Sequence, residues 1–279
     1  MNNSTFGLVF KELRKKRGFK LDSFEEIGLT RSTLSRFERG VNSLGVDQFY
    51  EALRFMDIPI AEVEQTYLAS GRGSFKAIYD ELYEAYYTMD VEKIKSFQKS
   101  FHEPLQKIAM KCLLLDFTAH GKLTEEEEEG LVDFFDAVED WTVYEFSLLQ
   151  FSIAQLHARN IANLLSQLHE DTAHFRHIRQ YRRYIIQITL KGAFALMVQD
   201  KLKRAEKELD TALDFTDQDD LYLRNELFFM QGYLTYKKGF PQKGHQEVKQ
   251  AIQTFENLGS TNAANYFKML EKRFMKIKK

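Results

Sequence analysis

Apolar residues recur at helical spacing from the start of the chain. Phe6, Val9, Phe10 and Leu13 occupy positions i, i+3, i+4 and i+7, so four apolar side chains share one face of a helix. This spacing predicts an amphipathic helix over residues 5–17, and the glycine at position 18 can end it.

The next predicted helices are short and are separated by glycines. Residues 21–27 predict a second helix, and Gly28 after them can turn the chain in the left-handed conformation. Thr30 fits the N-cap of a third helix over residues 31–39, with Thr33 at the third helical position, and Gly40 ends that helix.

Two more helices complete the first unit. Val46, Phe49, Tyr50 and Leu53 repeat the spacing of the first helix and predict a fourth one with these side chains on its buried face. A proline then precedes a fifth helix, which includes Val63 and Tyr67. Small residues without periodicity follow over positions 70–74, so a linker is expected there.

Beyond the linker, the chain shows helical periodicity without clear β alternation. Predicted helices cover residues 75–89, 91–100, 104–119, 124–139 and 142–156. Blocks of this length suit stacked helical hairpins. The predicted fold is therefore all-α, with a first unit over residues 1–69, a linker over 70–74 and a helical repeat unit over 75–279.

A weak internal repeat agrees with stacked hairpins. Gly192 aligns with Gly232 at a spacing of 40 residues, and the same spacing aligns Leu209 with Lys249. Each copy predicts a long helix, a tight turn and a second amphipathic helix. The pattern resembles degenerate tetratricopeptide repeats, which are normally 34 residues long. The resemblance implies a superhelix whose concave face fits an extended peptide or another helix.

The first helices of the two pairs, over residues 179–199 and 221–238, are expected to line that face. They combine amide, charged and aromatic groups, which can bond a peptide backbone and stack on apolar side chains. The candidate peptide-binding residues are Arg183, Gln187, Asn225, Glu226, Phe229, Tyr233 and Tyr236. In the alternative interpretation, Phe229 and Tyr233 belong to the core and Arg183 is a surface ion-pair partner.

Composition narrows the class of protein. The 279 residues include 14 glycines and 3 prolines, which is below average usage and disfavours turn-rich all-β folds and disordered chains. Cys112 is the one cysteine and lies in an apolar stretch, so a core position is favoured over a redox sensor. No apolar run approaches the roughly 18 residues of a membrane span, and no segment has a signal-peptide pattern. A cytoplasmic protein without membrane contact is therefore expected.

Charge is unevenly distributed along the chain. The formal net charge of −2 gives no overall attraction to nucleic acid. Residues 1–46, however, contain nine lysines and arginines against five acidic residues. A local surplus of positive charge therefore accompanies the first three predicted helices, where it can attract phosphate.

The third predicted helix has two different faces. Leu34, Phe37 and Glu38 share its inner side. The outer side carries Ser32, Ser35, Arg36 and Arg39. Serine bonds base edges or phosphate with little bulk, and arginine bonds guanine through two hydrogen bonds, so this face suits the major groove of DNA. The alternative is a solvated basic helix face, which is common in isolated helices.

The run LTRSTLSRFERG over residues 29–40 resembles the recognition segment of XRE/Cro-type helix-turn-helix domains, and the resemblance extends over residues 5–68. It implies a five-helix DNA-binding domain in which Arg31, Ser32 and Arg36 read bases. It also implies a partly buried salt bridge between Arg14 and Glu38, which explains an acidic residue on the inner side of the third helix.

Phosphate contacts are expected from lysines, because their charge acts at any base sequence. The candidates are Lys15 and Lys16, with Lys11 and Lys20. One departure from the family is Leu21, which occupies a position where many relatives have a polar residue that contacts phosphate.

The sequence contains no pattern typical of catalysis or metal binding. His169 and His174 are five positions apart, which is the wrong spacing for a zinc-protease helix. His174 and His177 share a helix face without further ligands, so a structural or surface role is favoured. The acidic run over 125–129 fits a solvated helix start. No catalytic residue, metal ion or cofactor is predicted.

The order of parts resembles that of the Rgg/MutR group of peptide-pheromone-responsive transcription regulators. This resemblance implies a homodimer on paired half-sites of double-stranded promoter DNA and a repeat domain that receives a short hydrophobic signalling peptide. It also implies a ligand-dependent surface for RNA polymerase. The alternatives are a DNA-located scaffold whose repeat domain docks a protein or senses a non-peptide ligand, and an enzyme with an accessory DNA-binding head.

Overall fold

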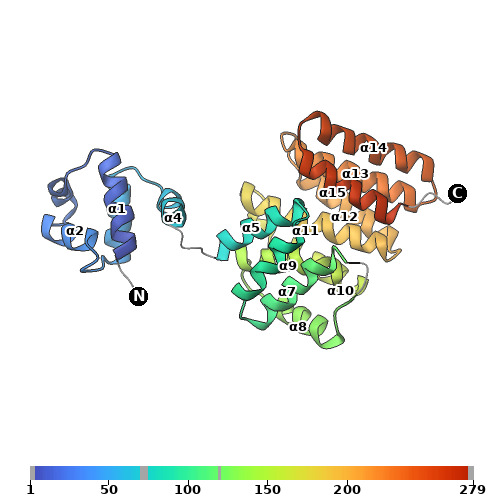
Figure 1. Ribbon diagram of the computed structural model, residues 1–279, viewed down its shortest axis with the longest axis horizontal. Coiled ribbons are helices and arrows are strands. Elements are labelled where there is room, and N and C mark those ends of the chain that lie inside the picture. Colours follow the sequence, from blue (N-terminus) through green and yellow to red (C-terminus); the bar gives the residue numbers. More distant parts are fainter. Residues whose placement is uncertain (1–3, 70–74, 119–120, 276–279) are drawn as a thin grey trace. The chain divides into compact units, whose positions relative to one another are not determined.

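The protein is all-α in the computed structural model, which describes residues 4–69, 75–118 and 121–275. Within these ranges no residue belongs to a strand. The chain divides into two compact units, Met1–Ala77 (unit 1) and Ile78–Lys279 (unit 2) (Figure 1). The linker predicted over 70–74 lies outside the described residues.

Unit 1 is a small helical domain with an aromatic core. Its elements are α1 (Ser4–Lys16), the 3-10 helix η1 (Leu21–Ile27), α2 (Arg31–Glu38), α3 (Val46–Phe55) and α4 (Ile60–Ala69). The ring centroid of Phe10 lies 5.9 Å from that of Phe24 and 5.6 Å from that of Phe37. Side chains of α1, η1 and α2 therefore meet at one point of the core.

The approach of α1 to α2 depends on a glycine. A Cβ atom at Gly7 would lie 2.1 Å from the carbonyl oxygen of Phe37, which is too close for any side chain. The turn before α2 has the predicted local features. Gly28 has a φ of 77°, and the Thr30 hydroxyl accepts a hydrogen bond of 3.2 Å from the backbone N–H of Thr33.

The buried face of α3 differs from the prediction. Val46 and Tyr50 are exposed, at 83% and 54%. The buried stripe instead starts at Phe49 and continues through Ala52, Leu53 and Met56. This stripe has the same i, i+3, i+4, i+7 spacing and begins three residues later, so the prediction for Val46 and Tyr50 was wrong because the pattern has two possible starting points.

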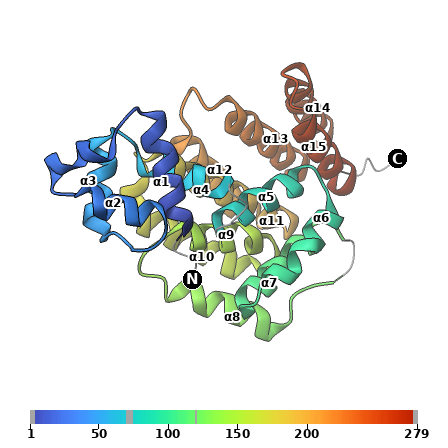
Figure 2. The same cartoon turned by 60° about the vertical axis from the view of Figure 1, so that its left-hand side comes forward.

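Unit 2 is a stack of helices. The first half comprises α5 (Phe75–Tyr87, which starts at the end of unit 1), α6 (Val91–Ser96), η2 (Phe97–Ser100), α7 (Pro104–Leu115), α8 (Glu125–Asp136), α9 (Val143–Ser152) and η3 (Ile153–Gln155). The second half comprises α10 (Ala158–Asp171), η4 (Ala173–Phe175), α11 (Arg179–Val198), α12 (Leu202–Phe215), α13 (Leu221–Lys237), α14 (Pro241–Asn257) and α15 (Thr261–Phe274). Figures 1 and 2 show α13, α14 and α15 as one layer at the C-terminal end.

The repeat is present with a spacing of 39 residues rather than 40. The helices α11 and α13 end at Val198 and Lys237, and α12 and α14 begin at Leu202 and Pro241. The turns between them also match, because Asp200 and Gly239 both have positive φ, at 59° and 95°.

The spacing of 40 residues was wrong because it aligned the buried Leu209 with the exposed Lys249. A spacing of 39 aligns Leu209 with the buried Val248. It also aligns Ala205 with Gly244, where a Cβ atom would lie 2.5 Å from the backbone nitrogen of Tyr236. Gly244 therefore lies at a close contact of α13 with α14, and the equivalent Ala205 is a small residue that is fully buried.

The acidic run at the start of α8 is only partly solvated. Thr124 caps the helix, and its hydroxyl accepts a hydrogen bond from the backbone N–H of Glu127 at 3.2 Å. Glu128 is 6% exposed and accepts hydrogen bonds of 2.7 Å from the His157 backbone N–H and from Asn160 Nδ2. Glu128 thus joins α8 to the start of α10, which corrects the prediction of a wholly solvated run.

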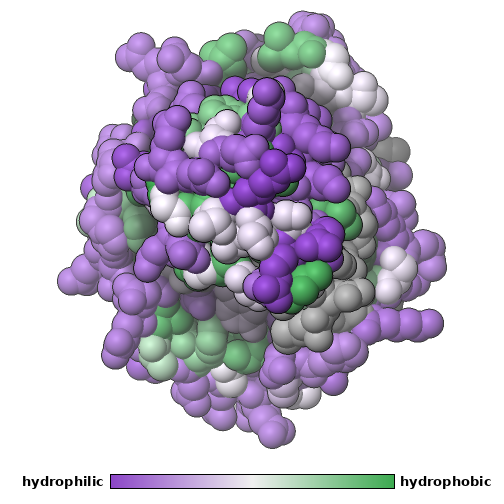
Figure 3. Space-filling model, turned by 90° about the vertical axis from the view of Figure 1, so that its left-hand side faces the viewer, coloured by the Kyte–Doolittle hydropathy of each residue, from purple (hydrophilic) through white to green (hydrophobic). Residues whose placement is uncertain are grey.

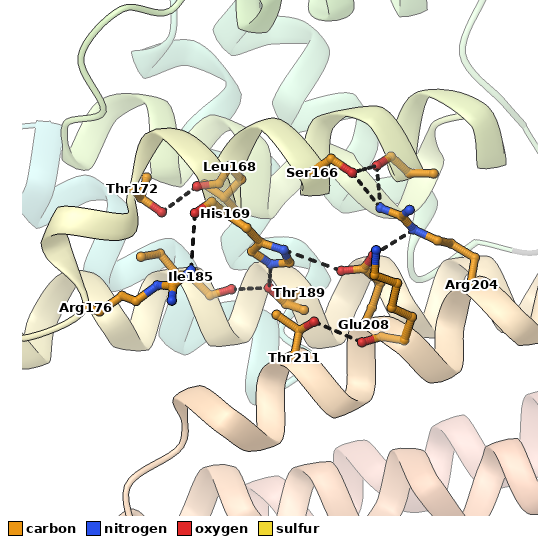
Figure 4. A network of polar contacts seen from close by, with 12 residues as sticks. Ser166, Leu168, His169, Thr172, Arg176, Ile185, Thr189, Arg204, Glu208 and Thr211 are labelled. Carbon is orange, nitrogen blue, oxygen red and sulfur yellow. Dashed lines mark hydrogen bonds and ion pairs between the residues drawn. The ribbon is translucent and has the colours of Figure 1, made fainter.

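A polar network is buried where α10, α11 and α12 meet (Figure 4). His169 Nε2 donates to the Thr189 hydroxyl at 2.9 Å, because that hydroxyl itself donates to the Ile185 carbonyl. Glu208 lies 3.7 Å from His169 Nδ1 and 2.7 Å from Arg204 Nε. Burial, with the charges of nearby cations, lowers the pKa of His169 to about 4, so this histidine is a neutral packing residue.

Composition led to two expectations, a core position for Cys112 and the absence of a membrane-spanning helix. Cys112 is completely buried in α7, and burial raises the pKa of its thiol well above its ordinary value. This environment fits a core position. Among the described residues, no helix combines the length and apolar character that a membrane span requires.

Candidate functional site

The outer face of α2 presents the predicted DNA-binding side chains. Arg31, Ser32, Arg36 and Arg39 are exposed and Ser35 is half-buried. Leu34, Phe37 and Glu38 on the opposite side are buried. One helix of unit 1 therefore offers a face of hydroxyl and guanidinium groups, while its apolar face is held in the core.

A buried ion pair fixes α2 on α1. Arg14 Nε lies 2.5 Å from Glu38 Oε1, and a second guanidinium nitrogen lies 3.0 Å from Oε2, so both carboxylate oxygens are bound. The same guanidinium donates to the Phe19 carbonyl at 2.6 Å. Both side chains are less than 10% exposed. This bidentate pair holds the angle at which α2 presents its outer face.

Several basic side chains of unit 1 already have local partners. Arg31 lies 3.2 Å from Asp22, and Lys16 lies 2.9 Å from Glu12. Arg39 Nε donates to the carbonyl of Ser35 at 3.1 Å. Lys15 is exposed on α1. The partners are themselves exposed, so phosphate can replace them at little cost. Figure 3 shows a surface on which hydrophilic residues predominate, with smaller apolar areas between them.

Three of the predicted peptide-binding residues lie near one another in unit 2. The Gln187 amide donates to the Tyr83 hydroxyl of α5. Arg183 is half-buried, and its Nε lies 3.7 Å from Asp220. Glu226 is 5% exposed, and burial raises its pKa to about 8, which the charge of Arg183 partly opposes.

Two predicted residues contact neighbouring helices. Asn225 donates to the Ala251 carbonyl of α14 at 2.9 Å. Phe229 is 1% exposed, and its ring centroid lies 4.6 Å from that of Phe267. Phe229 therefore lies in the core rather than on an open face, whereas Asn225 is half-buried and its peptide-binding role stays a prediction.

The last two predicted residues border an open cavity of about 1310 Å³. Tyr233 packs against Phe194 with a centroid distance of 5.0 Å, and Tyr236 stacks on Tyr233 at 6.2 Å. This cavity also has His245 and Phe274 in its wall, so it combines aromatic surface with groups that form hydrogen bonds.

A second cavity of about 390 Å³ adjoins the first, because both have Val198, Arg273 and Phe274 in their walls. Sequence reasoning missed the charged group that lies here. Asp116 accepts a hydrogen bond of 2.9 Å from the Tyr86 hydroxyl and forms an ion pair of 2.8 Å with Lys191 Nζ.

Arg273 completes this group. It donates to the backbone carbonyls of Asp116 and Thr118 at 2.5 and 2.8 Å. These side chains come from α5, α7, α11 and α15, so no local motif in the sequence could have indicated them.

A third, small cavity of about 40 Å³ is named the tyrosine pocket. Its lining includes Tyr83, Tyr87, Tyr266 and Glu226. The ring centroid of Tyr87 lies 4.7 Å from that of Tyr83 and 5.1 Å from that of Tyr266. Aromatic rings from α5 and α15 thus enclose one carboxyl group from α13.

Comparisons with known proteins agree with this two-part organisation. The profile of the family described as "HTH-type transcriptional regulator Rgg, C-terminal domain" matches residues 86–269. A helix-turn-helix profile matches residues 10–63. The second match includes all of α2 and the Arg14–Glu38 pair.

Solved structures share the fold at low sequence identity. A putative transcriptional regulator from Listeria monocytogenes EGD-e has a TM-score of 0.77 and 17% identity, over 98% of this chain and 97% of that chain. The SHP pheromone receptor Rgg2 from Streptococcus dysgalactiae has a TM-score of 0.73 and 19% identity, over 96% and 99%. PlcR from Bacillus thuringiensis, in complex with the peptide PapR7 and DNA, has a TM-score of 0.58 and 14% identity, over 96% of each chain.

The family match extends over most of the chain, and the fold is that of transcriptional regulators rather than enzymes. The helix-turn-helix match assigns DNA binding to unit 1. With its Rgg C-terminal domain and its helix-turn-helix, this chain belongs to the Rgg family of transcriptional regulators.

Proposed function

We propose that the protein is a cytoplasmic, peptide-responsive regulator that binds specific promoter sequences as a homodimer. In this proposal Arg31, Ser32, Ser35, Arg36 and Arg39 contact bases and nearby phosphates, and Lys15 and Lys16 contact phosphates only. The exposed face of α2 and the buried pair behind it support this assignment.

The adjoining cavities of unit 2 carry the ligand part of the proposal. Cavities of about 390 and 1310 Å³ with shared walls are large enough for several residues of a peptide. Apolar rings such as Phe194 and Phe274 can receive hydrophobic side chains, while polar groups of the walls can bond the peptide backbone. Rgg2, which this chain resembles in fold, is a pheromone receptor, and PlcR, which it also resembles, was solved in complex with a peptide. These likenesses support a peptide as the ligand.

Ligand binding would change the balance between two states of the dimer. The favoured state would hold two copies of α2 at major-groove sites separated by about one helical turn or a multiple of it, or would present a surface to RNA polymerase. A ligand shifts such a balance only by the difference between its affinities for the two states.

The decisive experiment is selection of DNA duplexes from a random library by the purified full-length chain. The selection is run with and without a pool of short hydrophobic peptides. We expect an enriched inverted repeat whose recovery changes when peptide is present. The Arg36→Ala variant is the matched control and should lose the enrichment while it keeps its fold.

Other outcomes have distinct meanings. Enrichment that no peptide changes would contradict peptide binding. It would favour a DNA-located scaffold whose unit 2 docks a protein or senses another ligand. Absence of any enriched sequence would contradict specific DNA recognition by α2.

A further inference from the structure

The tyrosine pocket contains a buried acidic side chain, one oxygen of which has no hydrogen-bond partner among the described residues. Glu226 is 5% exposed, and within the described part of the chain its Oε2 has no hydrogen-bond partner. An unpaired buried carboxyl oxygen is costly to the fold. Stability alone would favour a neutral apolar residue here, so the position of this oxygen on the pocket wall points to a ligand group that binds it.

The groups around Glu226 define the charge that the pocket can hold. Four tyrosine hydroxyls interact electrostatically with Glu226: those of Tyr83 and Tyr87 of α5, Tyr222 of α13 and Tyr266 of α15. Burial raises the pKa of all four hydroxyls, so they remain neutral. The charged groups that act on it from α11 and from the start of α13 are Arg183 and Asp220, and they pair with each other at 3.7 Å.

Lys191 also borders the pocket, but it is held by Asp116 at 2.8 Å and lies 4.7 Å from the centroid of the Tyr86 ring. The carboxyl of Glu226 is therefore the ionisable group of the pocket that lacks a close opposite charge. A cation can form an ion pair with its carboxylate form, an anion can form no ion pair with it, and an apolar group would leave Oε2 unbonded.

The pocket has room for a small group and a route to it. Its volume of about 40 Å³ exceeds the space that one water molecule needs. Lys191, Phe194 and Tyr266 border both this pocket and the cavity of about 390 Å³ in which the proposed function places the peptide. A group of a bound peptide can thus enter the pocket from that cavity.

We propose that Glu226 and the surrounding tyrosines bind a protonated primary amine carried by the peptide. The inference rests on the proposed function, since it names the group by which a peptide is held in unit 2. Three N–H bonds of an ammonium group can reach the carboxylate and tyrosine hydroxyls, and ring faces attract the cation. The amine is either the peptide's N-terminus or a lysine side chain.

Binding of this kind releases a proton. Because burial holds the pKa of Glu226 at about 8, the empty pocket has a protonated carboxyl at neutral pH. An ammonium group favours the carboxylate, so the affinity should rise as the pH increases from 6 to 8. An N-terminal amine itself loses its proton near pH 8, so its affinity should then fall, whereas a lysine amine should keep its affinity to about pH 10.

The test uses the full-length chain and a synthetic library of short hydrophobic peptides. Each peptide is made with a free or an acetylated N-terminus, and with or without a lysine. Retained peptides are titrated against the wild type, Glu226→Gln and the matched control Glu256→Gln, whose carboxyl lies at the surface of α14 in a pair with Lys268. We expect blocking of one amine, or Glu226→Gln, to weaken binding tenfold or more, and the two changes together to add little.

The outcomes separate this inference from the function on which it rests. Peptides that bind equally well with blocked amines, and equally well to Glu226→Gln, would overturn the amine site and leave the peptide receptor intact. Retention of no peptide by the wild type would overturn both. Thermal melts of the three proteins without peptide check that each one is folded.

Discussion

Two buried glutamates of this protein have opposite surroundings. In unit 1, both oxygens of Glu38 are bound by Arg14. In unit 2, Oε2 of Glu226 has no partner among the described residues. A satisfied buried pair stabilises one arrangement of two helices, whereas an unsatisfied acid destabilises its own unit. Glu38 therefore stabilises unit 1, whereas Glu226 is expected to destabilise unit 2 as long as no ligand is bound to it.

Glu226→Gln should make stability less sensitive to pH. Its folded-state pKa of about 8 lies above the ordinary value of 4.5, so the folded chain keeps a proton that the unfolded chain releases between these values. The wild type thus loses stability as the pH rises from 4.5 to 8, by an amount on the order of a few kcal/mol. Between pH 5 and pH 8, the melting temperature should therefore fall less for Glu226→Gln than for the wild type. An equal pH response in the variant and wild type would contradict a raised pKa.

Arg14→Ala should destabilise unit 1 by about 3–5 kcal/mol, because it leaves the Glu38 carboxylate buried without its partner. Hydrogen exchange of the backbone amides of α1 and α2 measures this loss within the full chain. Arg17→Ala is the matched control, because the Arg17–Glu62 pair of 3.4 Å is exposed and should contribute less than about 1 kcal/mol. Similar exchange in both variants would contradict a structural role for the buried pair.

At the scale of elements, local signals in the sequence predicted most of unit 1. Gly28 and the Thr30 cap act within a few residues, so the boundaries around α2 could be predicted. The buried face of α3 could not, because two stripes of apolar residues compete there and the packing of the other helices decides between them. The repeat was found with a shift of one residue, since a glycine was aligned with a glycine where the fold places Ala193 opposite Gly232.

The ligand site was less predictable than the helices. Arg183, Gln187 and Glu226 were predicted as ligand residues because they belong to the first helices of their pairs, and their role stays a prediction. Asn225, on the same helix as Glu226, donates to the Ala251 carbonyl of α14. The Asp116, Lys191 and Arg273 group joins residues far apart in the sequence, and a single sequence carries no local signal for such contacts. Tertiary packing, rather than helical periodicity, determines these positions.

Gly244→Ala should disrupt the hairpin of α13 and α14. The added Cβ would lie 2.5 Å from the backbone nitrogen of Tyr236, so the helices must separate, at a cost of about 1–3 kcal/mol. Gly130→Ala in α8 is the control, because a Cβ there meets no atom within 4 Å and alanine favours a helix by about 0.5–1 kcal/mol. Thermal unfolding should show opposite shifts, and a stabilised Gly244→Ala would contradict the close contact.

At the scale of the whole molecule, the uneven distribution of charge should distinguish DNA binding from the proposed peptide binding. Nine basic residues against five acidic ones fall in residues 1–46, although the chain as a whole has a net charge of −2. DNA binding by unit 1 should therefore depend strongly on salt, while the proposed contact of a peptide amine with the buried Glu226 should depend on salt less.

Lys15→Ala and Arg36→Ala test this separation. Removal of Lys15 should weaken binding to all DNA sequences alike and reduce the slope of log affinity against log salt by about one. Removal of Arg36 should cost about 1–3 kcal/mol on the selected sequence and little on random DNA. Titrations at several salt concentrations distinguish the two effects. Equal losses on both kinds of DNA for Arg36→Ala would contradict its base-reading role.

The hydrogen bonds from Arg273 to the carbonyls of Asp116 and Thr118 have a consequence for how unit 2 responds to force and heat. In an open array of repeats each hairpin touches only its neighbours, so the array can fray from either end. Here α15 is fastened back to the end of α7, and Tyr86 of α5 meets Tyr266 at 3.0 Å between hydroxyl oxygens. Side-chain hydrogen bonds thus join the last helix of unit 2 to its first helices, so the unit is expected to unfold cooperatively rather than to fray from α15.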